Sequence, residues 1–118
     1  MQYLVQMRLV PQGRQLDPAA GAAFFEEFIR PTLELGKKLQ EEKKILAGGP
    51  VSGAIALAMI VNAESARDLD DLLTSLPVWP RMEVEVTPLT TFDDRASSIE
   101  RRLGESRSRQ AGQSKGSA

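Results

Sequence analysis

The sequence predicts a small α+β domain in which four strands and two helices follow one another in the order β-α-β-β-α-β. Three observations support this fold class. The 118 residues suit one hydrophobic core and leave no room for a second domain. Segments at both ends of residues 1–92 alternate apolar and polar residues with the period of two that is typical of strands. Two segments between them repeat apolar residues at the spacing of helices.

The first strand and the first helix carry clear local signals. Every second residue from Tyr3 to Leu9 is apolar, which predicts a strand over residues 2–10. We predict that a helix starts at Pro18. Asp17 is a good N-cap, and a proline at the first helical position loses nothing by lacking its N–H.

The first helix contains one interruption. Its apolar stripe continues to Leu39, but Pro31 removes one backbone hydrogen bond and crowds the carbonyl group four residues earlier. We therefore expect a kink or a break near residues 28–30.

A hairpin is predicted after this helix. Residues 45–47 read as a short second strand and residues 54–61 as a third, which is apolar on both faces and so suits the centre of a sheet. Residues 48–53 are predicted to connect them, because their three glycines adopt positive φ angles readily.

The second half of the chain repeats the pattern of a helix beside a strand. Ser65 and Asp68 have capping-box spacing and precede a leucine-rich helix that should end before Pro77. Residues 82–87 alternate apolar and polar and predict the last strand.

The domain boundaries follow from these elements. Residues 1–92 are predicted to form the α+β domain and residues 93–103 a short C-terminal helix. Residues 104–118 are rich in Ser, Gln, Gly and Arg, and we expect them to form a flexible polar tail.

The predicted element order is the split βαβ, or ferredoxin-like, arrangement, with both helices on one face of an antiparallel sheet. The other face is left bare and carries Leu4 and Val10 beside the apolar third strand. Because such a face is rarely left to water, we expect a homodimer whose sheets face each other, or a larger homo-oligomer of such pairs. The alternative is a monomer whose C-terminal helix covers the sheet.

Composition and charge exclude several classes of function. The chain has no cysteine or histidine, so we expect no thiolate or zinc site and no cofactor. A net charge of −1 argues against nucleic-acid binding. The longest apolar run, residues 55–61, is too short to span a membrane, and no signal-peptide pattern precedes the first strand. We therefore expect a cytoplasmic protein that binds a small molecule.

Residues 76–86 read Leu-Pro-Val-Trp-Pro-Arg-Met-Glu-Val-Glu-Val. This run resembles the muconolactone δ-isomerase family, whose members carry a Leu-Pro, aromatic-Pro, Met and acidic-aliphatic-acidic sequence where the chain enters the last strand. The resemblance spans roughly residues 1–99. Its weaker matches are Met7 at the end of the first strand, the Asp17-Pro18 helix start, Leu39-Gln40 before acidic residues, and Ser97-Ser98-Ile99.

The resemblance implies a dimeric α+β barrel with a pocket between sheet and helices, where a proton is moved on a small lactone in aromatic-acid catabolism. It places the family's active-site carboxylate near Thr32, so that Glu34 is the nearest acidic residue. The second strand, residues 45–50, lacks the Trp-, His- and Arg-rich stretch of the family.

Moving a proton on a lactone requires a base, an acid and donors near the developing enolate oxygen. Glu34 and Glu27, together with Glu26, lie near the proline interruption, where a kink can turn one carboxylate inward. Tyr3 is a candidate donor on the inner sheet face. The alternative is that the glutamates are solvated helix surface and that Tyr3 packs in the core.

Three further residues are candidates for substrate binding. Arg30 and Arg81 can hold a substrate carboxylate, unless they are ordinary surface residues. Trp79 lies between two prolines, so a rigid loop holds its ring against either the pocket or a neighbouring subunit.

We therefore predict a cofactor-independent isomerase or lyase-like enzyme that acts by proton transfer on a small, anionic, muconolactone-like compound. One alternative is a non-catalytic ligand-binding or accessory subunit, which the departure in the second strand favours. Another is a cofactorless oxygenase or cyclase on the same barrel.

Overall fold

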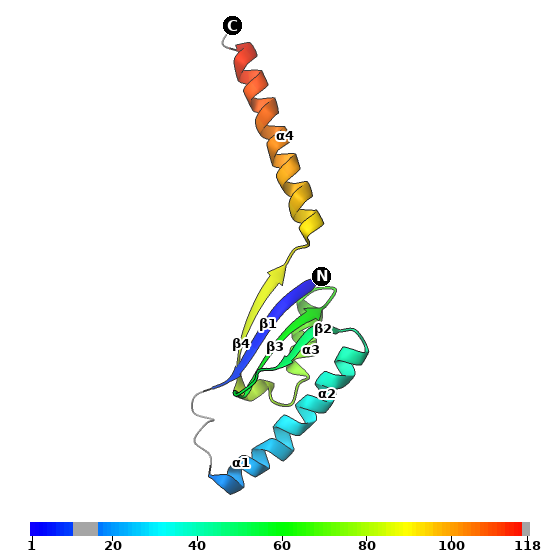
Figure 1. The fold of residues 1–118 in the computed structure, drawn as a ribbon, viewed down its shortest axis with the longest axis vertical. Coiled ribbons are helices and arrows are strands. Elements are labelled where there is room, and N and C mark those ends of the chain that lie inside the picture. The colour runs from blue at the N-terminus through cyan, green and yellow to red at the C-terminus, as the bar shows by residue number, and fades with distance from the viewer. Residues whose placement is uncertain (11–16, 117–118) are drawn as a thin grey trace.

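The computed structural model describes residues 1–10 and 17–116 (Figure 1). Four antiparallel strands form one sheet in the order β2-β3-β1-β4. The predicted α+β fold and its element order are confirmed. The strands are β1 (Gln2–Leu9), β2 (Ile45–Pro50), β3 (Ala56–Asn62) and β4 (Met82–Leu89). The helices are α1 (Pro18–Phe24), the π-helix η2 (Phe25–Ile29), α2 (Arg30–Glu41), α3 (Ala66–Thr74), the 3₁₀ turn η3 (Trp79–Arg81) and α4 (Phe92–Gly116).

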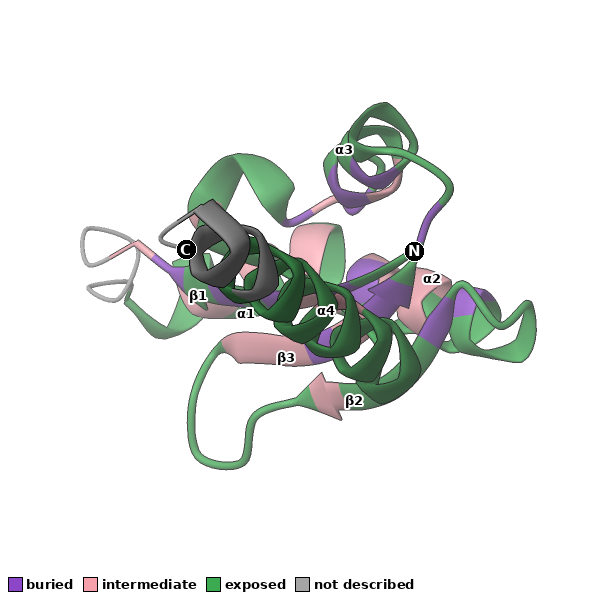
Figure 2. Ribbon diagram, turned by 90° about the horizontal axis from the view of Figure 1, so that it is seen from above, coloured by how far each residue is buried: buried purple, intermediate pink, exposed green. Residues whose placement is uncertain are grey.

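The core lies between the sheet and the helices α2 and α3, where buried residues gather (Figure 2). Strand β1 supplies the centre of this layer, because its odd-numbered residues from Tyr3 to Leu9 are all buried. They face Leu39 of α2 and Leu69 and Leu73 of α3. Strand alternation and helical periodicity thus meet in one apolar layer, as the sequence predicts.

Helices α1, η2 and α2 form one continuous helical segment that begins where the sequence predicts. Asp17 caps it, since its Oδ1 accepts a hydrogen bond of 2.7 Å from the Ala20 N–H. The α-helical pattern is interrupted close to residues 28–30, where we expected a kink or a break, but the segment stays helical. The interruption is a π turn, in which the Arg30 N–H donates to the Phe25 carbonyl group five residues earlier. This wider turn accommodates the ring of Pro31, which has no N–H to donate.

Strand β2 is longer than predicted and changes the position of the hairpin connection. It continues through Pro50, so the connection is residues 51–55 and not residues 48–53. The pairing with β3 shifts register between Ile45 and Ala47. Gly48 has a φ of 94°, and a Cβ atom there would collide with the Ala58 carbonyl oxygen of β3. The glycine therefore allows close strand pairing at a bulge and does not form the turn.

Helix α3 begins and ends as predicted. The Ser65 Oγ accepts from the Asp68 N–H at 3.1 Å, and the Asp68 Oδ2 accepts from the Glu64 N–H at 3.0 Å. The helix ends at Thr74, before Pro77.

The C-terminal helix differs most from the prediction. It does not end at residue 103, because α4 runs as one helix through Gly116 and includes most of the residues expected to form a flexible tail. Gly104 alone does not stop it, since one interior glycine costs only about 1 kcal/mol relative to alanine. In Figure 1, α4 projects away from the body and does not cover the sheet. None of the described helices combines the length and apolarity that a membrane span requires.

The sheet face opposite the helices carries Leu4, Ala58 and Ile60, all half-buried, beside the exposed Gln6 and Arg8. Helices α2 and α3 pack on the other side of the sheet, and α4 projects away from the body (Figure 1), so no described helix covers this face. The homodimer in which two such faces meet therefore stays a prediction.

Candidate functional site

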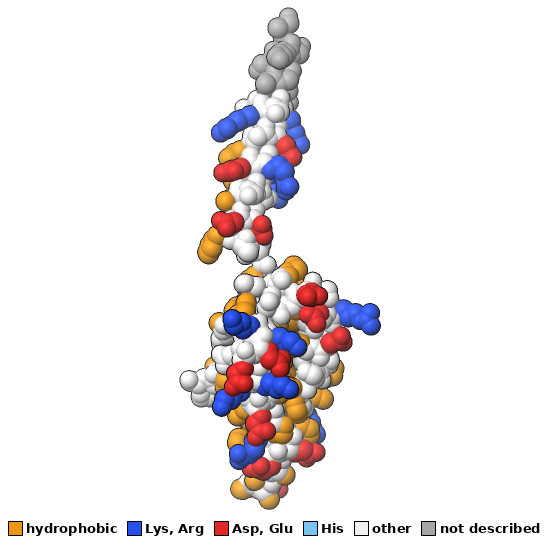
Figure 3. Space-filling model, turned by 90° about the vertical axis from the view of Figure 1, so that its right-hand side faces the viewer, with side chains coloured by type: hydrophobic (Ala, Val, Ile, Leu, Met, Phe, Trp, Pro, Cys, Tyr) orange, Lys and Arg blue, Asp and Glu red, His pale blue; other side chains and the backbone are white. Residues whose placement is uncertain are grey.

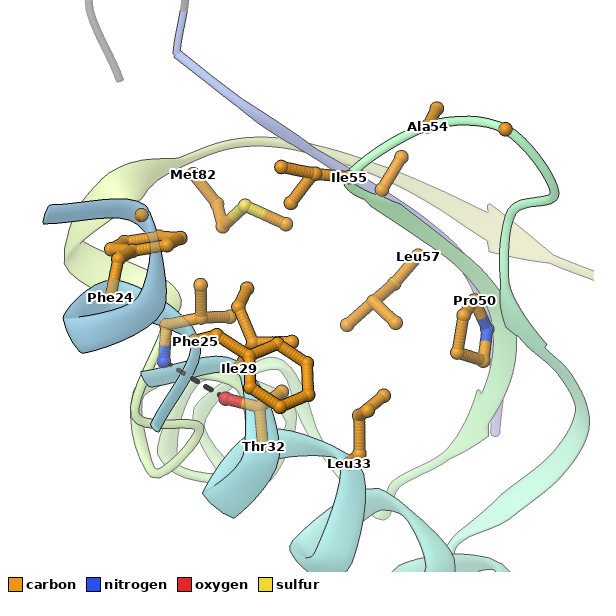
Figure 4. A pocket seen from close by; sticks show the side chains of 14 residues that line it. Phe24, Phe25, Ile29, Thr32, Leu33, Pro50, Ala54, Ile55, Leu57 and Met82 are labelled. Carbon is orange, nitrogen blue, oxygen red and sulfur yellow. Dashed lines mark hydrogen bonds between the residues drawn. The ribbon is translucent and has the colours of Figure 1, made fainter. Parts of the chain in front are cut away.

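A large cavity of about 880 Å³ separates the first helical segment from the end of the sheet (Figure 4). Its walls come from α1, η2 and α2 on one side, and from the hairpin connection, β3 and the start of β4 on the other. The lining residues are Gly21, Phe24, Phe25, Ile29, Thr32, Leu33, Pro50, Gly53, Ala54, Ile55, Ala56, Leu57, Val78 and Met82. The volume is within the usual range for a small-molecule site.

The π turn contributes to the shape of this cavity. Phe24 and Phe25 lie where α1 passes into the turn, Ile29 ends the turn, and Leu33 follows in α2. All four side chains line the same space in Figure 4. Phe25 and Leu33 are each 41% exposed, which places them at the mouth of the cavity.

Thr32 is the one polar side chain among the described wall residues, and its hydroxyl group both donates and accepts a hydrogen bond. It is 3% exposed, donates to the Phe28 carbonyl oxygen at 2.7 Å and accepts from the Val78 N–H at 3.1 Å (Figure 4). This bond joins α2 to the segment that leads into β4. Thr32 therefore fixes the back wall of the cavity and has no proton to offer a ligand.

Among the described residues, no acidic or basic side chain lines this larger cavity. No group of three possible metal-ligating side chains is found in the described part of the chain either. The cavity thus suits the apolar body of a ligand. Any charged side chain that contacts the ligand must therefore lie at the edge of this cavity.

A smaller cavity of about 180 Å³ adjoins the first along α2. The two share Thr32, Leu33, Pro50 and Leu57 as wall residues. Together they form one cleft between α2 and strands β2 and β3. Lys37 and Gln40 line only the smaller cavity.

A charged column borders the mouth of the larger cavity. It consists of Glu26, Arg30 and Glu34, each one position after the lining residue Phe25, Ile29 or Leu33. Arg30 donates two hydrogen bonds to the Glu26 carboxylate, at 3.1 and 3.0 Å.

Arg30 is also tied to the cavity wall. Its guanidinium carbon lies 5.1 Å from the centre of the Phe25 ring. The hydrogen bond to Glu26, the charge of Glu26 and the charge of Glu34 raise the pKa of the Arg30 guanidinium above its ordinary value. Arg30 therefore stays a fixed positive charge at the mouth.

The structure brings Arg81 towards the same helix. Its guanidinium carbon lies 5.4 Å from the centre of the Phe28 ring, which in turn is 5.4 Å from the ring of Phe24 in the cavity wall. Arg81 also precedes Met82, another wall residue. Both predicted arginines thus lie near the cavity, each over a phenylalanine ring.

The predicted acids and the tyrosine are placed differently. Glu34 and Glu27 are both exposed on the helix surface, and the helix does not turn either side chain into the core. Tyr3 is buried, and its hydroxyl group donates to the Met1 sulfur at 3.2 Å. It lies four residues along β1 from Met7, the partner of Leu57 in the cavity wall, which is roughly 13 Å at the rise of a strand. Tyr3 therefore does not line either cavity, and its catalytic role stays a prediction.

Trp79 does not line the cavity, although its neighbour Val78 does. Its side chain is 39% exposed in the short turn η3. Both roles predicted for this ring, contact with the substrate and contact with another subunit, therefore stay predictions.

Sequence reasoning missed most of the residues that form the cleft. Phe25, Ile29 and Leu33 repeat every four residues, which reads equally well as core packing. Lys37 is one of two adjacent lysines, a pattern that is typical of solvated surface. A sequence pattern cannot separate cavity-lining residues from core or surface residues. The tertiary structure does so, because it shows which side chains lie between the hairpin connection and the helix.

Comparison with known proteins is consistent with this architecture. The family model for muconolactone delta-isomerase matches residues 1–95. A crystal structure of muconolactone isomerase superposes with a TM-score of 0.61 and 27% sequence identity, over 77% of this chain and 90% of that one. No curated protein matches the chain. Most of α4 lies beyond the family match.

Proposed function

The chain belongs to the muconolactone delta-isomerase family, and from this premise we propose that it is a cofactor-independent isomerase that moves a proton within a small, anionic, cyclic compound. The observation that supports this most directly is the apolar cavity bordered by the charged column Glu26-Arg30-Glu34. The cavity holds the ring of the substrate, and the column supplies the charged groups that the walls lack.

Binding in this site combines burial with charge attraction. The phenylalanines and aliphatic side chains remove the apolar ring from water, which strengthens every electrostatic interaction at the mouth. Arg30 and Arg81 give the border of the cavity positive charge, which attracts an anion. Arg30 also lies where it can stabilise the enolate oxygen that forms when a proton leaves the carbon beside a carbonyl group.

Glu34 is the proposed base. It follows Leu33, which lines both cavities, and it has no ion pair within 4.0 Å among the described residues. Its carboxylate removes a proton from one ring carbon and returns it to another, so that the double bond moves and no atom is gained or lost. Glu27 is the second candidate, because it lies in the π turn on the same helical segment.

The test uses the purified full chain with muconolactone as substrate and follows ultraviolet absorbance. We expect turnover in the wild type. Because Gln cannot accept the proton, Glu34→Gln should lower kcat by at least about a hundredfold. Glu41→Gln changes an exposed glutamate at the end of the same helix and should leave the rate unchanged. Absence of turnover on a panel of unsaturated lactones would contradict the proposal.

A second candidate function is ligand binding without chemistry. It is favoured by the absence of any ionisable side chain from the walls of the larger cavity among the described residues. In that case the chain binds the same lactones, and Glu34→Gln leaves their affinity unchanged while no product forms.

A further inference from the structure

The narrow end of the cleft differs chemically from the rest of it. Lys37 is the one ionisable side chain among the described wall residues of the two cavities, and Gln40 lies beside it. The spacing of Leu33, Lys37 and Gln40 puts all three on the same face of α2. Helix α2 therefore presents an apolar side chain to the large cavity and two polar side chains to the small one.

Lys37 has no acidic partner within the described part of the chain. The two ion pairs found there are Arg30 with Glu26 and Lys44 with Glu42. Glu34 and Glu41 lie three and four residues away on the same helix, yet neither comes within 4.0 Å of the Lys37 ammonium group. Its charge is thus available to a ligand, whereas Arg30 already shares its charge with Glu26.

The remaining walls of the small cavity favour an elongated ligand. Besides Lys37 and Gln40 they consist of Thr32, whose hydroxyl group is fully bonded, and of apolar residues and glycines. The two cavities adjoin each other, since Thr32, Leu33, Pro50 and Leu57 line both. A molecule that fills the large cavity with an apolar ring therefore extends a short arm towards Lys37.

We infer that Lys37, assisted by Gln40, binds the carboxylate of a monocarboxylic acid whose ring occupies the large cavity. This inference rests on the proposed function for the identity of the site, and it adds the residue that binds the carboxylate of the substrate. The Lys37 ammonium group donates to one carboxylate oxygen and the Gln40 amide to the other. The aliphatic stem of Lys37 packs along the apolar wall while its charged end reaches the ligand.

The test compares an acid with its neutral ester, so that only the carboxylate charge changes. Calorimetric titration of the full chain uses 3-phenylpropionate and its methyl ester as probes. We expect the acid to bind at least about tenfold more tightly than the ester, which is the usual strength of a hydrogen-bonded charge pair. In Lys37→Gln this preference should fall below about twofold, with the affinity for the ester unchanged.

The matched control is Lys38→Gln. Lys38 is the next residue, is also exposed, and lines neither cavity, so this variant should keep the preference for the acid. Equal binding of acid and ester by the wild type, failure of both probes to bind, or an acid preference that survives in Lys37→Gln would overturn the inference. The inference would also be overturned if Arg30→Gln lost the preference for the acid over the ester while Lys37→Gln kept it.

The result is separable from the proposed isomerase activity. A preference for the acid that depends on Lys37, without turnover of any lactone, supports the inference and contradicts the activity. Turnover with the same KM for the lactone acid in the wild type and in Lys37→Gln supports the activity and contradicts the inference.

Discussion

At the scale of single residues, Thr32 shows how one side chain joins two parts of the site. The sequence placed a carboxylate of the related enzymes near this position, but here a threonine is buried with both hydrogen-bonding functions used. It ties α2 to the segment before β4, from residues 46 positions apart. The buried wall therefore holds a bonded hydroxyl group at this position and no carboxylate.

The first prediction concerns this bond. Thr32→Val keeps the shape of the side chain but leaves the buried Val78 N–H without its acceptor. We expect the free energy of unfolding to fall by about 1–3 kcal/mol. Urea denaturation measures this, and Thr32→Ser, which keeps the hydroxyl group, is the control. Equal stability of Thr32→Val and the wild type would show that the bond is not needed.

Arginines at the border illustrate what sequence can and cannot assign. Arg30 and Arg81 were candidates because an anionic ligand needs positive partners. The structure places each over a phenylalanine of the helix that forms the cavity wall. Residue type indicates that both can carry positive charge, but no local pattern shows that Arg30 is already paired with Glu26.

At the scale of elements, local signals predicted most starts and ends correctly. Asp17 and Ser65 cap helices because each side chain bonds to a backbone N–H only three residues away. The π turn was not predicted, since an interrupted helix can kink, break or widen, and packing selects among these outcomes. The extent of β2 was also missed, because glycines signal both turns and bulges.

The second prediction tests the role of glycine in β2. Gly48→Ala should destabilise the fold by more than about 1 kcal/mol, because φ is 94° and the added Cβ collides with the backbone of β3. Gly36→Ala in α2 is the matched comparison, since no atom lies within 4 Å of the added Cβ. It should stabilise the helix by up to about 1 kcal/mol. Thermal denaturation of both variants measures this. The prediction is wrong if Gly48→Ala does not lower the melting temperature or if Gly36→Ala lowers it as much.

At the scale of the whole molecule, apolar side chains remain uncovered in several places among the described residues, and two of these concern the pairing of subunits. One is the sheet face around Leu4 and Ile60, and the other is the exposed stripe of α4, with Phe92, Ile99 and Leu103. Positive and negative side chains intermingle on the face drawn in Figure 3, with no large patch of one sign.

The last prediction concerns pairing of the chain through its sheet. We expect sedimentation equilibrium to give a mass of at least twice the 12.9 kDa of the chain. Ile60→Arg buries an unpaired charge between the two sheets and should shift the protein to the monomer. Leu103→Arg on α4 should leave the mass unchanged. The opposite pattern would move the contact from the sheet to α4.

The sequence by itself determined the order of the elements, their caps and the family, because these depend on patterns within a few neighbouring residues and on the run at residues 76–86. Only the tertiary structure decided what lines the cleft. Leu57 and Val78 meet Phe25 and Leu33 there from separate parts of the chain. Tyr3 is excluded although its strand was predicted correctly. The physical reason is that a cavity forms between elements, and no local pattern records which side chains their packing leaves uncovered.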